Sequence, residues 1–323
     1  MIFKAITQLV FATTLVNLFP VDAGYYQWQA DAAVDIDRPA WSSQELRLAM
    51  EVLPEAQARY DAPVKVDTDS FGIVTSARSA LVVDRDSGAI LFAKQPDQLR
   101  AIGSVTKLMS ALVFLDTEPD LSQYVTLDPK QDYVGGGRHY VAFYEPVLLE
   151  DVLAASLVGS DNTATQSLAR FSGLDIEDFI ARMNEKAVEL EMTNSMFADP
   201  TGVDPDNLST ARDLVTLLEV ADENEIIKSF MQSSSTTLSQ SGNSITVNNT
   251  NVLLTSFLNN GNYDVLGGKT GFLPEAGYVL ATTVQEGDHA VHVIVMGAES
   301  KDARADEAKG LAAWAFKTFS WDE

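Results

Sequence analysis

A serine and a lysine stand three residues apart in the segment Ser104-Val105-Thr106-Lys107. Residues three apart on a helix share one face, so the hydroxyl and the amine are within reach of each other. A serine hydroxyl is a weak nucleophile and needs a neighbouring base. A lysine amine can be that base only when it is neutral near pH 7, a state that burial or a second nearby cation favours. The pair therefore predicts nucleophilic catalysis by Ser104, with Lys107 as the base.

The position of Ser104 at the start of a predicted helix, residues 104–116, adds a second chemical feature. Its backbone N–H lacks a partner within the helix and lies at the positive end of the helix dipole, where it could stabilise an oxyanion. Apolar Leu108, Ala111 and Leu112 would exclude water. Alone, this pattern is weak, because about one is expected by chance in a chain of this length. A capping serine beside an exposed lysine explains it equally well.

A second pattern, Ser160-Asp161-Asn162, lies in a predicted turn between two helices. Ser160 could relay a proton between the nucleophile, Lys107 and a leaving amine. The side-chain amide of Asn162 both donates and accepts hydrogen bonds, which suits it to fixing Lys107 and a substrate peptide group. Alone, these residues could equally be an ordinary helix N-cap.

A third pattern, Lys269-Thr270-Gly271, is expected to open a strand after Gly267-Gly268. Lys269 offers a positive charge and Thr270 a hydroxyl for a carboxylate. Gly271 would let a ligand backbone lie against the strand as an added β-partner. A simple turn before a strand is the alternative interpretation. The three patterns in this order nevertheless form a strong combined signal for acyl transfer.

The elements that must position these patterns follow the order strands, helices, strands and a final helix. Two β-rich runs around Asp86-Ser87-Gly88 predict a hairpin, and helices dominate residues 148–190. Strand patterns at 278–284 and 290–296 predict a second hairpin, with a helix over 302–319 after it. The expected fold class is α/β, of the α+β kind. The terminal strands would share an antiparallel sheet flanked by helices, and the middle helices would form an all-helical lobe.

Three smaller expectations complete this pattern. Ser209 is expected to cap a helix that runs to about Ala221. The Ser/Thr/Asn-rich stretch 232–251 alternates in a way that predicts short exposed strands. One face of the last helix is expected to belong to the core, through Leu311, Trp314, Ala315 and Phe319.

Composition excludes several classes of function. The 323 residues include 22 Lys and Arg against 46 Asp and Glu, a formal net charge of −24, so nucleic acid is not expected as a partner. Cysteine is absent, which excludes disulfides, thiolate nucleophiles and iron–sulfur clusters. The histidines are His139, His289 and His292, and the last two would point to opposite faces of a strand. We therefore expect neither a metal site nor a cofactor.

The N-terminal residues resemble a secretory signal. One lysine and an apolar run precede Val21-Asp22-Ala23, so residues 1–23 are expected to be a signal peptide cut after Ala23. A buried helix and an uncleaved anchor are the alternatives, the latter being the only expected membrane contact. Residues 24–75 would then be an extension and linker, and residues 76–320 the catalytic domain. The expected location is extracytoplasmic, in the periplasm or at the cell surface.

With all three patterns in place, residues 76–320 resemble the low-molecular-mass penicillin-binding proteins, the D-alanyl-D-alanine carboxypeptidase family of serine peptidases. Further similar stretches are ADPTGVDPDNLSTARDL and GGKTGFLPEAGYVLATT. The resemblance implies a β-lactamase/transpeptidase-like fold without cofactor or metal. It also implies roles for individual residues: Ser104 as acylated nucleophile, Lys107 as base, Ser160 and Asn162 in the proton network, Lys269, Thr270 and Gly271 on the substrate strand, the N–H groups of Ser104 and Phe272 as oxyanion hole, and Arg304 on the terminal carboxylate.

Departures from the family pattern leave questions open. Asp161 stands where many members have Gly, Phe272 where His is frequent, and Thr250 where some carry Arg. Arg304 could also be a surface arginine at a helix start. The chain ends at a point similar to the shorter endopeptidase-like members, which leaves the substrate type open.

The resemblance implies a serine-type D-Ala-D-Ala carboxypeptidase that acts on peptidoglycan stem peptides and is inhibited by β-lactams. A DD-endopeptidase that cuts cross-links is the alternative. A β-lactamase is disfavoured, because the loop 197–209 contains Asp199, Asp204 and Asp206 but no glutamate to activate a deacylating water. A non-catalytic wall-binding protein is disfavoured by the intact pair of Ser104 and Lys107.

Overall fold

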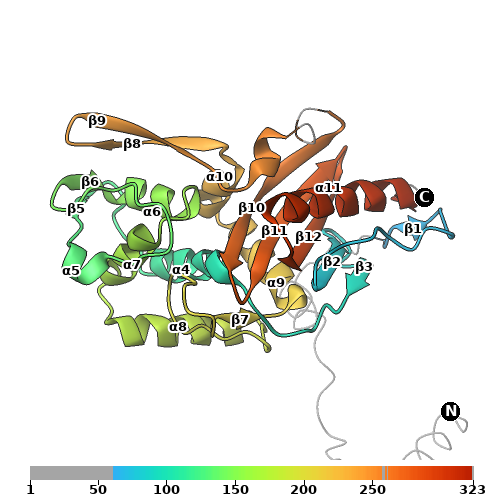
Figure 1. Ribbon diagram of the computed structural model, residues 1–323, viewed down its shortest axis with the longest axis horizontal. Helices are drawn as coiled ribbons and strands as arrows, with labels where there is room; N and C mark the ends of the chain where they lie inside the picture. Colours follow the sequence, from blue (N-terminus) through green and yellow to red (C-terminus); the bar gives the residue numbers. More distant parts are fainter. Residues whose placement is uncertain (1–60, 257–258, 260, 322–323) are drawn as a thin grey trace, which may run out of the picture. The chain divides into compact units, whose positions relative to one another are not determined.

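The strands from both ends of the region 76–320 share one five-stranded antiparallel sheet with the order β10-β11-β12-β2-β3, as expected (Figure 1). Their bounds are Ser79–Asp84 (β2), Ile90–Lys94 (β3), Tyr263–Leu273 (β10), Gly277–Glu286 (β11) and His289–Ala298 (β12). β10 lies at the edge of this sheet, so one of its sides is open to a further strand. This edge strand carries the Lys-Thr-Gly pattern.

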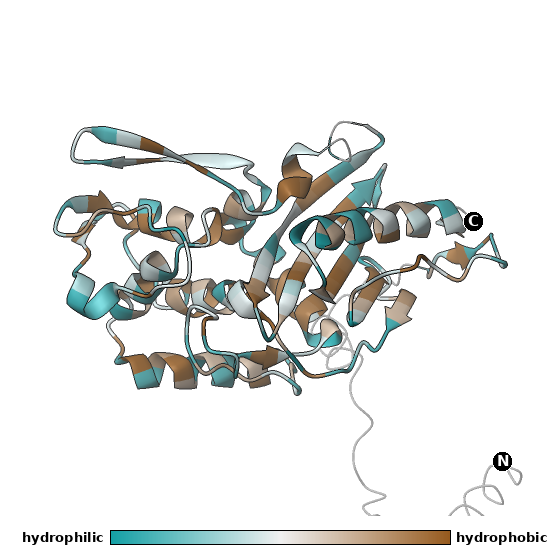
Figure 2. Ribbon diagram, viewed as in Figure 1, coloured by the Kyte–Doolittle hydropathy of each residue, from teal (hydrophilic) through white to brown (hydrophobic). Residues whose placement is uncertain are grey.

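Helices cover both faces of the sheet, so both faces are buried. Successive side chains of a strand point to opposite faces and therefore enter different cores. Leu81 and Ile294 belong to the core that the sheet forms with the helical lobe. Val82 and Val293 belong to a second core beneath the helix α11, Lys301–Thr318. The strands accordingly contain many apolar residues, whereas the hairpin of β8 (Ser235–Gln240) and β9 (Asn243–Asn248) contains few (Figure 2).

The helical lobe surrounds α4, the helix that follows Ser104. Every described side chain of α4 from Thr106 to Phe114 is buried, which explains why most residues of this helix are apolar. Helix α9 packs against the sheet through Leu214 and Leu218, on the face opposite α11. The helices between the sheet strands are Thr106–Leu115 (α4), Pro129–Asp132 (α5), Leu149–Leu157 (α6), Asn162–Phe171 (α7), Ile176–Glu189 (α8), Ala211–Glu223 (α9) and Glu225–Gln232 (α10).

Smaller elements connect these layers. A four-stranded sheet contains Tyr124–Thr126 (β5), Pro146–Leu148 (β6), Ser235–Gln240 (β8) and Asn243–Asn248 (β9), so the stretch 232–251 does form exposed strands. Two-stranded pairs join Val64–Lys65 (β1) to Phe319–Ser320 (β13) and Arg100–Ala101 (β4) to Leu208–Ser209 (β7). Two 3₁₀ turns, Gly103–Val105 (η1) and Val252–Thr255 (η2), complete the described elements.

Three local expectations were wrong. Thr210, not Ser209, caps α9, because Ser209 pairs with Arg100 in a two-stranded ladder and is therefore extended. The Lys-Thr-Gly pattern lies inside β10, since the strand continues through Gly267 with a local irregularity of register. Phe319 lies beyond α11 in β13 and does not share the face of Leu311.

The computed structural model describes residues 61–256, 259 and 261–321. The expected signal peptide, the cleavage position and most of the extension 24–75 lie outside the described residues. Among the residues described, no helix has the length and apolar character needed to cross a membrane.

Candidate active site

Ser104 and Lys107 face each other at the junction of η1 and α4. Ser104 lies in the 3₁₀ turn directly before the α-helix and is half-buried, whereas the side chain of Lys107 is 0% exposed. Lys107 Nζ lies 3.0 Å from Ser104 Oγ and donates a hydrogen bond to it. The alternative of a capping serine beside an exposed lysine is therefore wrong.

The amine of Lys107 is held by two further acceptors. It donates to Asn162 Oδ1 at 2.7 Å and to the backbone carbonyl of Thr201 at 2.5 Å. Burial lowers the pKa of Lys107 from 10.5 to about 7, although the negative charges of Asp199 and Asp161 oppose this effect. Near neutral pH a large fraction of the amine is thus uncharged and able to accept the proton of Ser104.

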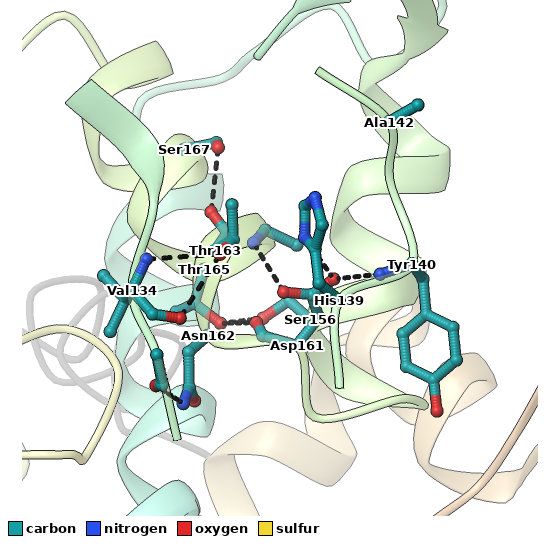
Figure 3. Close-up of polar contacts among 12 residues, drawn as sticks. Val134, His139, Tyr140, Ala142, Ser156, Asp161, Asn162, Thr163, Thr165 and Ser167 are labelled. Atoms are coloured by element: carbon teal, nitrogen blue, oxygen red, sulfur yellow. Dashed lines mark hydrogen bonds and ion pairs between the residues drawn. The ribbon is translucent and has the colours of Figure 1, made fainter. Parts of the chain in front are cut away.

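Asp161 shapes the turn that carries the second pattern (Figure 3). It is the N-cap of α7 and accepts from Ala164 N, while its other carboxylate oxygen accepts from Tyr140 N at 2.8 Å and lies 3.4 Å from His139 Nδ1. Ser160, directly before it, has a φ of +59°, a left-handed conformation that is strained for a residue with a Cβ. The N-cap interpretation is therefore confirmed for Asp161, and the catalytic roles of Ser160 and Asn162 stay predictions.

Ser160 has an amine partner of its own. Lys269 Nζ donates to Ser160 Oγ at 2.8 Å and to the carbonyl of Thr270 at 3.2 Å. Lys269 is 1% exposed, and burial, together with the positive charges of Lys107 and Arg304, places its pKa well below the ordinary value. The two serines and two lysines thus form two hydroxyl–amine pairs.

Two glycines allow the edge strand β10 to approach Ser104. A Cβ on Gly271 would collide with the carbonyl oxygen of Ile102 and lie 3.3 Å from Ser104 N. Gly103 has a φ of +53°, and a Cβ there would lie 2.8 Å from Phe272 N. The backbone N–H groups of Ser104 and Phe272 are consequently close neighbours, as two donors to one oxyanion must be.

Arg304 belongs to the site and is not a surface residue. It is 4% exposed, and its Nη1 donates to the carbonyls of Gly271 and Val279, both at 3.2 Å. Its guanidinium lies 5.8 Å from the ring centroid of Tyr278. Burial lowers the pKa of Arg304 to about 10, so the group stays charged at neutral pH.

All nine residues expected to form the site meet at one cleft of about 660 Å³. Lys107 and Lys269 are buried directly behind its wall. The cleft is lined by the other seven, Ser104, Ser160, Asn162, Thr270, Gly271, Phe272 and Arg304, together with residues of the loop 136–140 and the segment 248–252.

Sequence reasoning missed the contacts that the backbone supplies. The carbonyl of Thr201 binds Lys107, and the carbonyl of Gly135 accepts from Asn162 Nδ2 at 2.8 Å. Asp199 fixes the loop of Thr201 by accepting from its N–H and from that of Gly202. The only available signal was the resemblance of the stretch around Asp-Pro-Thr-Gly to the family.

The three histidines are dispersed in the fold. His139 stacks on Phe143, His289 stacks on Trp321, and buried His292 lies 3.0 Å from Thr283 Oγ1. Within the described residues, no group of three or more His, Cys, Asp or Glu side chains is arranged to hold a metal ion.

Comparison with known proteins gives concordant matches. Residues 66–300 match the model of the D-alanyl-D-alanine carboxypeptidase family. An Escherichia coli K12 protein named D-alanyl-D-alanine endopeptidase is 31% identical over 275 residues, 84% of this chain and 86% of that protein. The Bacillus subtilis 168 carboxypeptidase DacF is 26% identical over 75% of this chain and 63% of its own length. The solved structure of the Streptomyces K15 DD-transpeptidase superposes with a TM-score of 0.71 at 26% identity, over 77% of this chain and all of that one.

Proposed function

The chain belongs to the D-alanyl-D-alanine carboxypeptidase family and is a serine peptidase of the penicillin-binding-protein fold, and from this premise we propose that Ser104 is its acylated nucleophile. The supporting observation is the 3.0 Å contact between Ser104 Oγ and the buried amine of Lys107, whose pKa is about 7. A neutral amine at this position can remove the hydroxyl proton as the oxygen attacks.

Acylation then uses the other groups of the cleft. Ser104 Oγ attacks the carbonyl of the D-Ala-D-Ala bond, and the N–H groups of Ser104 and Phe272 stabilise the oxyanion. Ser160, held by Lys269 at 2.8 Å, relays the proton that Lys107 took from Ser104 to the leaving amine as the peptide bond breaks. Water then hydrolyses the ester, which frees Ser104 and the new carboxyl end.

The terminal carboxylate of the substrate would lie at β10. The hydroxyl of Thr270 donates to Thr250 Oγ1 at 2.7 Å and can rotate toward a ligand. Arg304 supplies a permanent positive charge directly behind Gly271. Peptidoglycan stem peptides that end in D-Ala-D-Ala offer this carboxylate, and β-lactams that mimic this end would acylate the same serine.

Slow hydrolysis of the β-lactam ester is supported by the hydrogen bonds that Asp199 accepts in the loop 197–209. Both carboxylate oxygens of Asp199 already accept hydrogen bonds, one of them from Asp204 N and Asn207 Nδ2. No Asp or Glu is among the described residues that line the cleft. A carboxylate placed to activate a deacylating water is therefore lacking in that lining, and we expect negligible turnover of nitrocefin.

Endopeptidase activity is the second candidate, favoured by a specific observation. The Escherichia coli relative and a Pseudomonas aeruginosa relative at 31% identity are both named endopeptidases, and this chain covers 86% and 76% of them. It covers 62% of the Escherichia coli carboxypeptidase DacC. Digestion of purified peptidoglycan, with Ser104→Ala as the control, decides the question. Release of D-alanine supports the carboxypeptidase, and loss of cross-linked dimers supports the endopeptidase.

Export remains part of the proposal. Residues 1–23 would direct the chain out of the cytoplasm, residues 24–75 would link this signal to the catalytic domain 76–320, and the enzyme would act on the cell wall. N-terminal sequencing of the mature protein tests this arrangement, with Gly24 as the expected first residue.

A further inference from the structure

The charge of the cleft differs in sign from that of the chain. The whole chain carries a formal net charge of −24. Yet every described charged residue that lines the cleft is basic: Arg138, Lys301 and Arg304. A cleft lined by cations attracts anionic ligands even when the net charge of the protein is negative. The distribution therefore points to a ligand that carries more than one negative charge.

Two of these cations stand together on α11. Lys301 is the first residue of the helix, and Arg304 follows three residues later on the same side. The N-cap Ser300 accepts from Ala303 N, so the helix begins in a regular way. A lysine in the first turn is unfavourable, because the N-terminus already carries positive partial charge. Its presence there is thus not explained by the stability of the helix.

Among the described residues, no carboxylate lines this end of the cleft, although Glu299 and Asp302 flank Lys301 in the sequence. Arg304 is 4% exposed. Its Nη1 donates to two backbone carbonyls, and its Nε has no hydrogen-bond partner among the described residues. Lys301 is exposed at the cleft wall beside it. Neither side chain forms an ion pair among the described residues, so both charges are available to a ligand.

A leaving group of one amino acid has fewer carboxylates than this end of the cleft has cations. Free D-alanine carries one carboxylate, and Thr270 with Arg304 suffices to hold it. Lys301, an exposed cation on the same wall, can bind a further carboxylate of a larger leaving group. A peptide stem released from a cross-link is such a group, since it carries carboxylates on its acidic residues as well as beside the released amine.

We propose that Lys301 extends the carboxylate site of Thr270 and Arg304 into a subsite on the leaving-group side of the scissile bond, where Lys301 binds a second carboxylate of an acidic peptide leaving group. The subsite favours cross-linked substrates over pentapeptides that release only D-alanine. This inference rests on the proposed function and specifies which substrate that function prefers.

The test compares two lysines of one helix. Lys301→Met removes the cation at the cleft, and Lys317→Met removes an exposed cation from the last turn of α11, outside the cleft lining. Both variants change the net charge equally. For each, kcat/KM is measured on a purified D,D-cross-linked muropeptide dimer and on a pentapeptide monomer, at low and at high salt.

We expect Lys301→Met to lower the ratio of dimer to pentapeptide kcat/KM about three- to fivefold at low salt, as for an exposed ion pair. The effect should shrink at high salt because of screening. The effect should also vanish with a dimer in which the leaving-side carboxylates are amidated, except the one beside the released amine. Lys317→Met should leave the ratio unchanged.

Each contrary result has a distinct meaning. A ratio unchanged by Lys301→Met, or lowered equally by Lys317→Met, overturns the subsite while the proposed peptidase stands. Cleavage of pentapeptide without any cleavage of dimer by the wild type also overturns it. If the wild type cleaves neither substrate and no acyl-enzyme forms on Ser104, the proposed function itself fails, and the subsite fails with it.

Discussion

The acylation rate should depend steeply on pH, because only the neutral form of Lys107 can accept a proton. Lowering its pKa from 10.5 to about 7 raises the neutral fraction at pH 7 from about one in 3,000 to about one half. Between pH 8 and pH 5 this fraction falls about 90-fold. We therefore expect the second-order rate constant for acylation by a fluorescent penicillin to fall by a similar factor, with a midpoint near pH 7, in stopped-flow measurements.

A charge-preserving variant provides the control for this prediction. Arginine remains protonated throughout this pH range, so Lys107→Arg should lower the acylation rate by about 10³ at pH 8 and abolish its dependence on pH. Circular dichroism should show that the variant is folded. A wild-type rate that is flat between pH 5 and pH 8, or that rises only near pH 10, would refute the assignment of Lys107 as the base.

Three further changes test neighbouring parts of the structure. Asp161→Asn removes a negative charge that favours the ammonium of Lys107, so the midpoint of the pH–acylation profile should move to lower pH; an upward move would contradict this. Gly271→Ala places a Cβ against the carbonyl of Ile102. This should displace the oxyanion donors and slow acylation at least about 100-fold. An unaltered rate would show that the strand can shift. Asp132→Ala removes a buried carboxylate that binds an arginine twice at 2.7 Å; chemical denaturation should show a loss of about 3 kcal/mol, and a loss below about 1 kcal/mol would contradict the importance of this pair.

The sheet was predictable because its strands are apolar, bounded by turns and buried on both faces. Val82 and Val293 sit in such runs, and the turn signals on either side limited the ways they could pair. The three patterns that meet at the cleft could be found in the sequence because the chemistry proposed for them depends on side-chain type and spacing. Ser104 and Lys107 stand three residues apart on a helical segment, so their side chains were expected to lie on one face and to meet.

The remaining features depend on contacts that leave no signal in a single sequence. Every residue has a carbonyl, so nothing marked Thr201 as the acceptor for Lys107. The burial of Arg304 follows from how α11 crosses the sheet, which local sequence does not determine. Ser209 and Thr210 are both good N-caps, and only the pairing of Ser209 with β4 decided between them.

The most direct measurement of the central claim is the titration of the Lys107 amine in the folded enzyme. Nitrogen-15 NMR of the lysine side chains, with Lys107→Arg to assign the signal, reports the charge of each amine as pH changes. The structure predicts that one lysine, absent from the variant, loses its proton near pH 7. A signal from Lys107 that keeps the ammonium shift up to about pH 10, the ordinary lysine range, would contradict it.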